Sequence, residues 1–116
     1  LPFEQTHGEI TSLGFRIMDF AYSVDLSAIP EQSADAVTAL DVWVLDALRP
    51  TPHPSHLSLP ESLETIARFA PRQAVLTNLH IDMDYDTVAR GTPENVTPAY
   101  DGMRIDVTAG VLLEGS

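Results

Sequence analysis

Hydrophobic residues occupy every second position in two early stretches of the chain, which a tight turn near residues 18–19 separates. The apolar positions of the two stretches are Leu13, Phe15 and Ile17, then Phe20, Tyr22 and Val24. Because successive side chains of a strand point to opposite faces, this alternation predicts a half-buried antiparallel pair of strands. Residues 1–6 also have the pattern of a strand. A chain that begins inside such an element, and without Met, is expected to be a fragment.

The following segments alternate between helical and extended patterns. A short helix is expected after Pro30, because apolar residues follow it at helical spacing. Continuous apolar runs predict buried strands at residues 41–45 and 73–77. Residues 96–100 and 103–107 flank Asp101 and Gly102, a strong hairpin signal. Together these patterns predict a layered α/β arrangement with mixed strands.

A proline-rich loop precedes the second helix. Residues 48–60 contain four prolines, which disfavour both a helix interior and a central strand. Ser58 and Glu61 then have the spacing of a capping box, in which each side chain bonds the backbone of the other residue. A helix is therefore expected to begin next to this loop.

The composition narrows the candidate partners. The formal net charge is −11, and the positive side chains are six scattered Arg with no Lys, so long nucleic acids are not expected as ligands. No apolar run approaches the ~20 residues of a membrane span, and a cytoplasmic protein without a membrane partner is expected. A homodimer is compatible with the sequence. Cysteine is absent, so any metal must be held by His, Asp or Glu, which suits zinc, manganese or iron.

All four histidines lie at predicted strand ends or in loops. His7 ends the first strand, His53 and His56 lie in the proline-rich loop, and His80 follows the strand at 73–77. Asp25 ends another strand. Because sites in α/β folds gather at strand ends, these positions are compatible with one shared cleft.

These residues occur in an order that resembles the metallo-β-lactamase fold. The matching segments cover nearly the whole chain and are FEQTHG at 3–8, SLGFRI at 12–17, YSVD at 22–25, VLDALR at 44–49, HPSHLSL at 53–59, AVLT at 74–77 and AYDGM at 99–103. The sequence looks most similar to the phosphonate-pathway phosphodiesterase branch, which also resembles the tRNA 3′-processing nucleases. The resemblance implies that residues 1–116 are the C-terminal half of a four-layer αββα domain, a mixed sheet with flanking helices.

Members of that family hold two metal ions. The resemblance implies that His7 is a ligand of one ion and that Asp25 bridges both. The family has a third ligand His directly after the strand at 73–77, where this sequence has Asn78. His80 lies two residues later, on the same side of an extended segment, and is favoured as the ligand, with the Asn78 amide oxygen as the alternative. The family's His-x-His-x-Asp-His motif is absent here and is expected in the missing N-terminal half.

The proline-rich loop holds the remaining candidate residues. His56 is in the family's place for a histidine that protonates the leaving group. His53 and Arg49 are candidates for substrate binding, because a guanidinium can contact a phosphate. The alternatives are a loop-stabilising hydrogen bond for His56, a stiffened surface residue for His53, and packing of its stem on the loop for Arg49. Asp46, at the end of a buried strand, is a candidate for orienting a ligand His.

The resemblance implies a hydrolase that cleaves a small phosphodiester, such as a cyclic or nucleotide phosphate, by attack of a metal-bound hydroxide. Two zinc or manganese ions would be its cofactors. One alternative is a tRNA 3′-processing nuclease. The other is a metal-poor binding or scaffold domain, which Asn78 and the absent motif suggest. The chain alone is expected to be a poor hydrolase.

Overall fold

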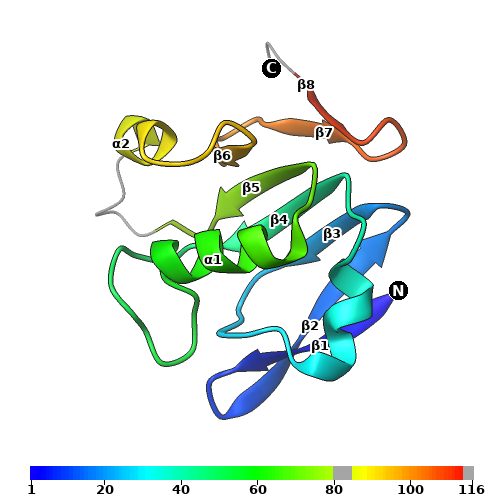
Figure 1. Ribbon diagram of the computed structural model, residues 1–116, viewed down its shortest axis with the longest axis vertical. Helices are drawn as coiled ribbons and strands as arrows, with labels where there is room; N and C mark the ends of the chain where they lie inside the picture. The colour runs from blue at the N-terminus through cyan, green and yellow to red at the C-terminus, as the bar shows by residue number, and fades with distance from the viewer. Residues whose placement is uncertain (80–84, 114–116) are drawn as a thin grey trace.

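A computed structural model describes residues 1–79 and 85–113, and its main feature is a six-stranded mixed sheet (Figure 1). In order across the sheet, the strands are β1 (Pro2–His7), β2 (Ile10–Ile17), β3 (Phe20–Ser23), β4 (Val42–Asp46), β5 (Gln73–Thr77) and β6 (Val96–Pro98). The first three strands pair antiparallel, and β3 to β6 pair parallel. The sequence prediction of an α/β arrangement with a mixed sheet is thus confirmed.

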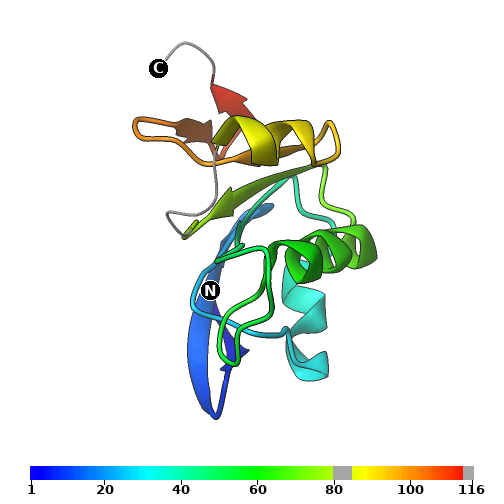
Figure 2. The same ribbon diagram turned by 90° about the vertical axis from the view of Figure 1, so that its left-hand side faces the viewer.

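Helices cover one face of this sheet. The 3₁₀-helix η1 (Glu31–Val37) and the α-helix α1 (Leu59–Phe69) lie on the same side of it (Figure 2). The remaining elements are α2 (Tyr85–Arg90) and a separate hairpin of β7 (Arg104–Asp106) and β8 (Val111–Leu113). The helix predicted after Pro30 is therefore present in the 3₁₀ form. In the described part of the chain, no helix has the length and apolar character needed to cross a membrane.

Strand β4 shows how the core is divided between the two faces. Trp43 and Leu45 belong to the larger core cluster, which includes residues of η1 and α1. Val42 and Val44, which point the other way, form a smaller cluster with residues of the β7–β8 hairpin. All four side chains are buried, so the continuous apolar run is explained by a strand that is covered on both faces.

The predicted capping box begins α1 and fixes the end of the proline-rich loop. The Glu61 backbone N–H donates to Ser58 Oγ at 3.3 Å, and the Ser58 N–H donates to Glu61 Oε1 at 2.9 Å. These two bonds satisfy amide groups that the first turn of a helix leaves without partners. One turn later, the buried Ser62 hydroxyl donates to the main-chain carbonyl of Asp46. The helix is thus attached to the end of β4.

The predicted hairpin at Asp101–Gly102 is wrong. A turn is present, with the Met103 N–H donating to the Tyr100 carbonyl at 3.0 Å. However, β6 pairs in parallel with β5, and β7 pairs with β8 instead. Val96 and Pro98 are buried, so burial of β6 at the sheet edge outweighs the local preference of the Asp-Gly turn for joining adjacent strands.

The antiparallel pair β2–β3 is confirmed, but the apolar side of β2 is exposed rather than half-buried. Leu13, Phe15 and Ile17 on β2 are 54%, 49% and 58% exposed. Gly14, which lies between two of them, is buried. The alternation therefore identified the strand correctly, although the apolar side of β2 is not covered by any described part of the chain.

Candidate functional site

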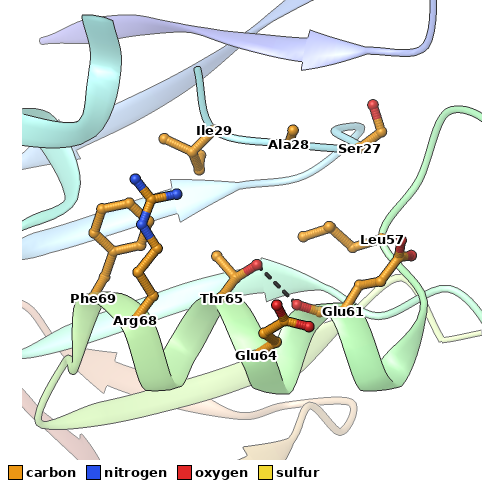
Figure 3. Close-up of a pocket in the computed structure, with 9 residues that line it drawn as sticks. All are labelled: Ser27, Ala28, Ile29, Leu57, Glu61, Glu64, Thr65, Arg68 and Phe69. Carbon is orange, nitrogen blue, oxygen red and sulfur yellow. Dashed lines mark hydrogen bonds between the residues drawn. The ribbon is translucent and has the colours of Figure 1, made fainter. Parts of the chain in front are cut away.

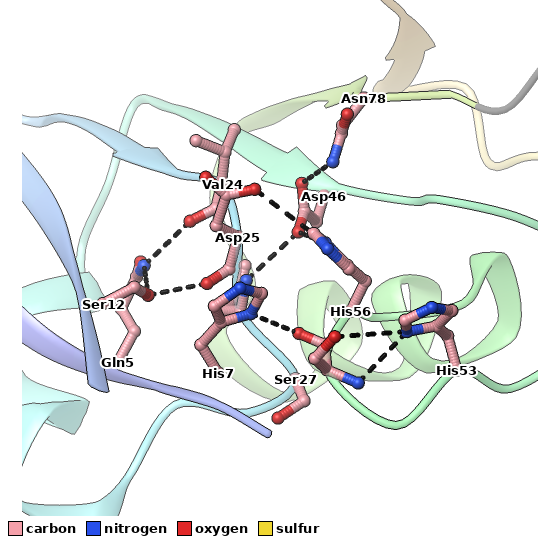
Figure 4. A network of polar contacts seen from close by, with 12 residues as sticks. Gln5, His7, Ser12, Val24, Asp25, Ser27, Asp46, His53, His56 and Asn78 are labelled. Atoms are coloured by element: carbon pink, nitrogen blue, oxygen red, sulfur yellow. Dashed lines mark hydrogen bonds and ion pairs between the residues drawn. The ribbon is translucent and has the colours of Figure 1, made fainter. Parts of the chain in front are cut away.

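The polar residues of the candidate site lie at one edge of the sheet. Strands β1, β3, β4 and β5 run in the same direction, because β2 is antiparallel to both of its neighbours. Their carboxyl ends therefore meet at the same edge, which is the usual place for a site in such sheets. This edge brings together His7, Asp25, Asp46 and Asn78, and the loop after β4 adds His56 (Figure 4).

His7 is held in one orientation by the proline-rich loop. Its Nδ1 lies 2.7 Å from the Ser55 carbonyl oxygen, and because a carbonyl can only accept, Nδ1 carries the proton. The other ring nitrogen, Nε2, then has a free lone pair in the neutral imidazole. Gly8 has a φ of 62° and lies against Ser55, so the chain turns here without a side chain in the way. A His fixed by a backbone carbonyl in this manner is typical of metal ligands.

The carboxylate of Asp46 is buried and receives three hydrogen bonds. Its Oδ2 accepts from the Leu26 N–H at 3.1 Å and lies 3.0 Å from His56 Nδ1. Its Oδ1 accepts from Asn78 Nδ2 at 3.2 Å. The Asp46 side chain is 0% exposed. Such a carboxylate, fixed on both oxygens, can orient an imidazole and stabilise its positive charge.

His56 occupies the centre of the cluster. The side chain is 17% exposed, and its Nδ1 lies 4.0 Å from Asp25 Oδ1 in addition to the bond with Asp46. Its ring stands edge-on to that of His7, with centroids 4.9 Å apart, and 5.3 Å from that of His53. Because the Asp46 carboxylate accepts from Nδ1, Nε2 is the nitrogen left to exchange a proton with a ligand. Asp46, a candidate for orienting a ligand His, contacts His56 instead.

The donor groups fit a divalent cation. Asp25, Asp46 and His56 each offer a ligand atom, and these atoms lie within 4.8 Å of one another. The Asp25 side chain is 59% exposed, so its carboxylate is accessible, whereas both oxygens of Asp46 are already used. His56 Nδ1 is likewise engaged with Asp46. Nitrogen from His7, whose ring contacts that of His56, and oxygen from Asp25 are a donor pair that zinc and manganese accept. His80, the favoured third ligand, lies outside the described residues.

The two residues expected to bind substrate differ in their surroundings. Arg49 is turned back on its own loop, where Nε donates to the Thr51 carbonyl at 3.2 Å and Nη2 to the Pro52 carbonyl at 2.6 Å. His53 borders His56, and its Nδ1 accepts the Ser55 N–H at 3.1 Å. Hydrogen bonds within the loop therefore hold its conformation. His53, although it is flanked by two prolines, lies beside the His56 ring rather than alone on the surface.

The surface has two pockets, called hollows here, beside this cluster and another away from it. One of 210 Å³ is lined by Asp25 and Asn78, among others, and one of 360 Å³ extends from Asn78 to Tyr100 and Asp101. A third, of 290 Å³, lies between α1 and residues 27–29 (Figure 3). Asp25 or Asn78 lines each of the first two, whereas no residue of the cluster lines the third. The first two are therefore the candidate places for a substrate.

The titration of His53 provides a first prediction. Burial, the nearby Arg49 guanidinium, and then His56 and His7 hold the pKa of His53 below its ordinary 6.5. Histidine NMR titrations should show this depression, and Arg49→Ala should reduce it without removing it, because burial is the larger cause. The lowered pKa means that the folded protein favours neutral His53. The contribution of His53 to the stability of the fold is therefore fully present above pH 6.5 and is lost as the pH falls through the folded pKa. Arg72→Ala is the control. It removes an arginine that pairs with Asp41 and is not among the causes of the shift, so the pKa of His53 should not change. A His53 pKa at or above 6.5 would contradict this assignment.

Comparisons with known proteins agree with this arrangement. The family model for the β-lactamase superfamily domain matches residues 1–81. The crystal structure of a new diphosphatase from the PhnP family aligns with a TM-score of 0.85 and 32% identity, over 88% of this chain and 40% of that one. The metallo-β-lactamase fold protein YhfI from Bacillus subtilis aligns with a TM-score of 0.68 and 15% identity, over 84% of this chain and 45% of that one.

An octanoyltransferase of Porphyromonas gingivalis is 24% identical over 105 residues, which are 88% of this chain and 21% of that protein. The chain thus spans about a fifth of this relative and less than half of each similar structure. The family model nevertheless covers well over half of the chain, and both structures share the arrangement of its strands and helices. The chain therefore belongs to the β-lactamase superfamily domain family and has the metallo-β-lactamase fold.

Proposed function

We propose that this chain is part of a metal-dependent hydrolase that cleaves a small phosphodiester. The observation that carries the proposal is the pair of Asp46 and His56, with 3.0 Å between Oδ2 and Nδ1, placed beside the candidate ligands His7 and Asp25. A proton donor next to a cation site is a combination that accelerates hydrolysis of a phosphate ester.

His7 and Asp25 are the residues that would hold the metal, together with His80 or Asn78. Two divalent ions, zinc or manganese, would lower the pKa of a bound water and neutralise phosphate oxygens. The Asn78 Nδ2 donates to Asp46, so only its amide oxygen remains to face a cation. His7 is prepared for this role by its bond to the Ser55 carbonyl, because in the neutral ring this bond leaves the lone pair on Nε2.

His56 would protonate the oxygen that leaves phosphorus. In its charged form the ring donates Nδ1–H to Asp46 and presents Nε2–H to the substrate. The carboxylate stabilises the imidazolium before transfer and holds the ring in one orientation, without itself exchanging a proton. After transfer, the neutral ring keeps its Nδ1–H bond to Asp46, and solvent can protonate Nε2 again.

The volume of the hollows and the negative charge of this chain favour a small substrate. The hollows beside the site measure 210 Å³ and 360 Å³, and the net charge of −11 repels long polyanions. A second candidate is hydrolysis of a diphosphate bond, which the 32% identical diphosphatase favours. Both reactions break a P–O bond, and the alkoxide that leaves a phosphodiester gains more from the leaving-group acid than the less basic phosphate that leaves a diphosphate.

We further propose that residues 1–116 are the C-terminal half of the domain. The chain spans 40% of the similar diphosphatase, and the His-x-His-x-Asp-His motif is absent from it. The exposed apolar side of β2, with Leu13, Phe15 and Ile17, is the surface on which the second sheet of an αββα domain would pack.

The test of this function is a substrate panel with the complete protein. After loading with zinc or manganese, it should hydrolyse bis(p-nitrophenyl) phosphate, and a chelator should abolish this activity, which the metal should restore. A cyclic nucleotide and a nucleoside diphosphate separate the two candidate reactions. A precursor tRNA with a 3′ extension tests the nuclease alternative. Absence of both metal binding and turnover would favour the non-catalytic scaffold.

A further inference from the structure

The turn that carries Asp25 is held by two side chains that are not among the candidate ligands (Figure 4). Gln5 on β1 and Ser12 on β2 lie directly opposite one another in the sheet. Gln5 Nε2 donates to Ser12 Oγ at 3.1 Å and to the Val24 carbonyl at 3.1 Å. Ser12 Oγ in turn donates to the Asp25 carbonyl at 2.6 Å. The two side chains therefore hold consecutive carbonyls of the turn.

The direction of this network is fixed by its acceptors. A carbonyl can only accept, so the amide nitrogen of Gln5 must face Val24, and its second N–H is then available to Ser12. The hydroxyl of Ser12 accepts this bond and passes its own proton towards Asp25. On the other side of the turn, the Leu26 N–H donates to Asp46 Oδ2 at 3.1 Å. Three successive residues of the turn are thus anchored by side chains.

Asp25 depends on this anchoring because its own side chain is weakly held. Its backbone has a φ of 57°, in the left-handed region that residues other than Gly rarely adopt. Among residues 1–79 and 85–113, its carboxylate makes no hydrogen bond, and its ion-pair contact is His56 Nδ1 at 4.0 Å. The backbone of the turn therefore sets the direction of the Cα–Cβ bond of Asp25, and with it the positions that the carboxylate can reach.

Burial of the Gln5 side chain leaves one of its polar atoms without a partner among the described residues. Gln5 is buried, and within the described part of the chain its Oε1 has no hydrogen-bond partner, which is unfavourable. A side chain at Gly14 would collide with this Oε1 and with the ring of Phe3, so the space for Gln5 requires a glycine on β2. An aliphatic residue would fill the same space without the unpaired Oε1, but it would remove the donor to the Val24 carbonyl. The glutamine is therefore kept at the cost of one unpaired oxygen, and what it adds is the fixed position of the turn.

We propose that Gln5 and Ser12 are positioning residues that direct the Asp25 carboxylate towards a divalent cation. The inference rests on the proposed function, in which Asp25 is a metal ligand. Partners that orient a ligand are worth about 10–100-fold in metal affinity. Loss of either donor would let the turn relax from its left-handed conformation and move the carboxylate, while the ligand atoms themselves remain in the protein.

The experiment measures zinc affinity of the complete protein by competition with a chromophoric chelator. Ser12→Ala and Gln5→Leu should bind zinc about 10–100-fold more weakly than the wild type. Ser12→Thr keeps a hydroxyl and should restore most of the affinity. Thr11→Ala changes an exposed neighbour on β2 and is the matched control, with unchanged affinity. Thermal unfolding of each metal-free variant separates an effect on the site from an effect on the fold.

The outcomes distinguish this inference from the function on which it rests. If the wild type binds zinc and both Ser12→Ala and Gln5→Leu bind it equally well, the positioning role is wrong and the proposed function stands. Weaker binding that parallels lower stability of the metal-free protein, and that Ser12→Thr does not restore, also overturns it, because the network then serves the fold alone. A wild type that binds no zinc or manganese overturns both.

Discussion

Replacement of His7 by alanine should remove metal and activity together for every substrate. The variant loses Nε2, the lone pair offered to the cation, and the Nδ1 bond of 2.7 Å to the Ser55 carbonyl that orients it. Loss of a partner that only orients a ligand costs about 10–100-fold in metal affinity, so the loss of the ligand itself should exceed that range. Metal content by elemental analysis and turnover of a phosphodiester should fall in parallel in the complete protein.

Ser55→Ala is the matched control for this experiment. The acceptor of the His7 bond is the main-chain carbonyl, which alanine retains, so this variant should keep its metal. It removes the contact between Ser55 Oγ and His53 Nδ1, at 3.3 Å, without changing a ligand. Full metal content in His7→Ala would exclude His7 as a ligand. Full metal content with lost activity would instead place His7 among the groups that contact substrate.

The elements of the fold were predictable where local and long-range preferences agree. The strand at 73–77 and the capping box at Ser58 and Glu61 are found as expected. The prediction of a hairpin at 96–107 was wrong, because an Asp-Gly turn is also compatible with strands that pair elsewhere. The pairing of β6 with β5 depends on burial of Val96, which the local sequence does not indicate. The exposed face of β2 could not be foreseen from alternation, which identifies an apolar side but not what covers it.

The candidate site was predictable as a list of residue types but not as a set of contacts. Strand ends and the family resemblance led to His7, Asp25 and His56, which the sheet brings to one edge. Gln5 and Ser12 carry no comparable signal, because a polar residue in a strand pattern is ordinarily taken as facing solvent. The Asp46–His56 bond joins residues ten apart across an irregular loop, and no spacing rule predicts such a contact.

Replacement of His56 by alanine in the complete protein should lower kcat by about 10²–10⁴-fold, the usual effect of losing a general acid. The effect should depend on the leaving group. A substrate that expels an alkoxide needs the proton from Nε2, whereas a p-nitrophenolate departs without one and should be slowed much less. Metal content should be unchanged, because Nδ1 bonds Asp46 and the proposed task of Nε2 is to give its proton to the substrate. kcat for both kinds of substrate, together with elemental analysis, gives the comparison.

His53→Ala is the control that separates this chemistry from the loop. His53 lies in the same loop, with its ring centroid 5.3 Å from that of His56, but it has no bond to Asp46. Its removal should therefore change kcat less and without dependence on the leaving group. If His56→Ala slows good and poor leaving groups alike, His56 binds substrate or shapes the loop, and if it strips the metal, His56 is a ligand. Either result would transfer the role of the acid to another group, and the Asp46 carboxylate would then serve to fix the loop rather than to stabilise an imidazolium.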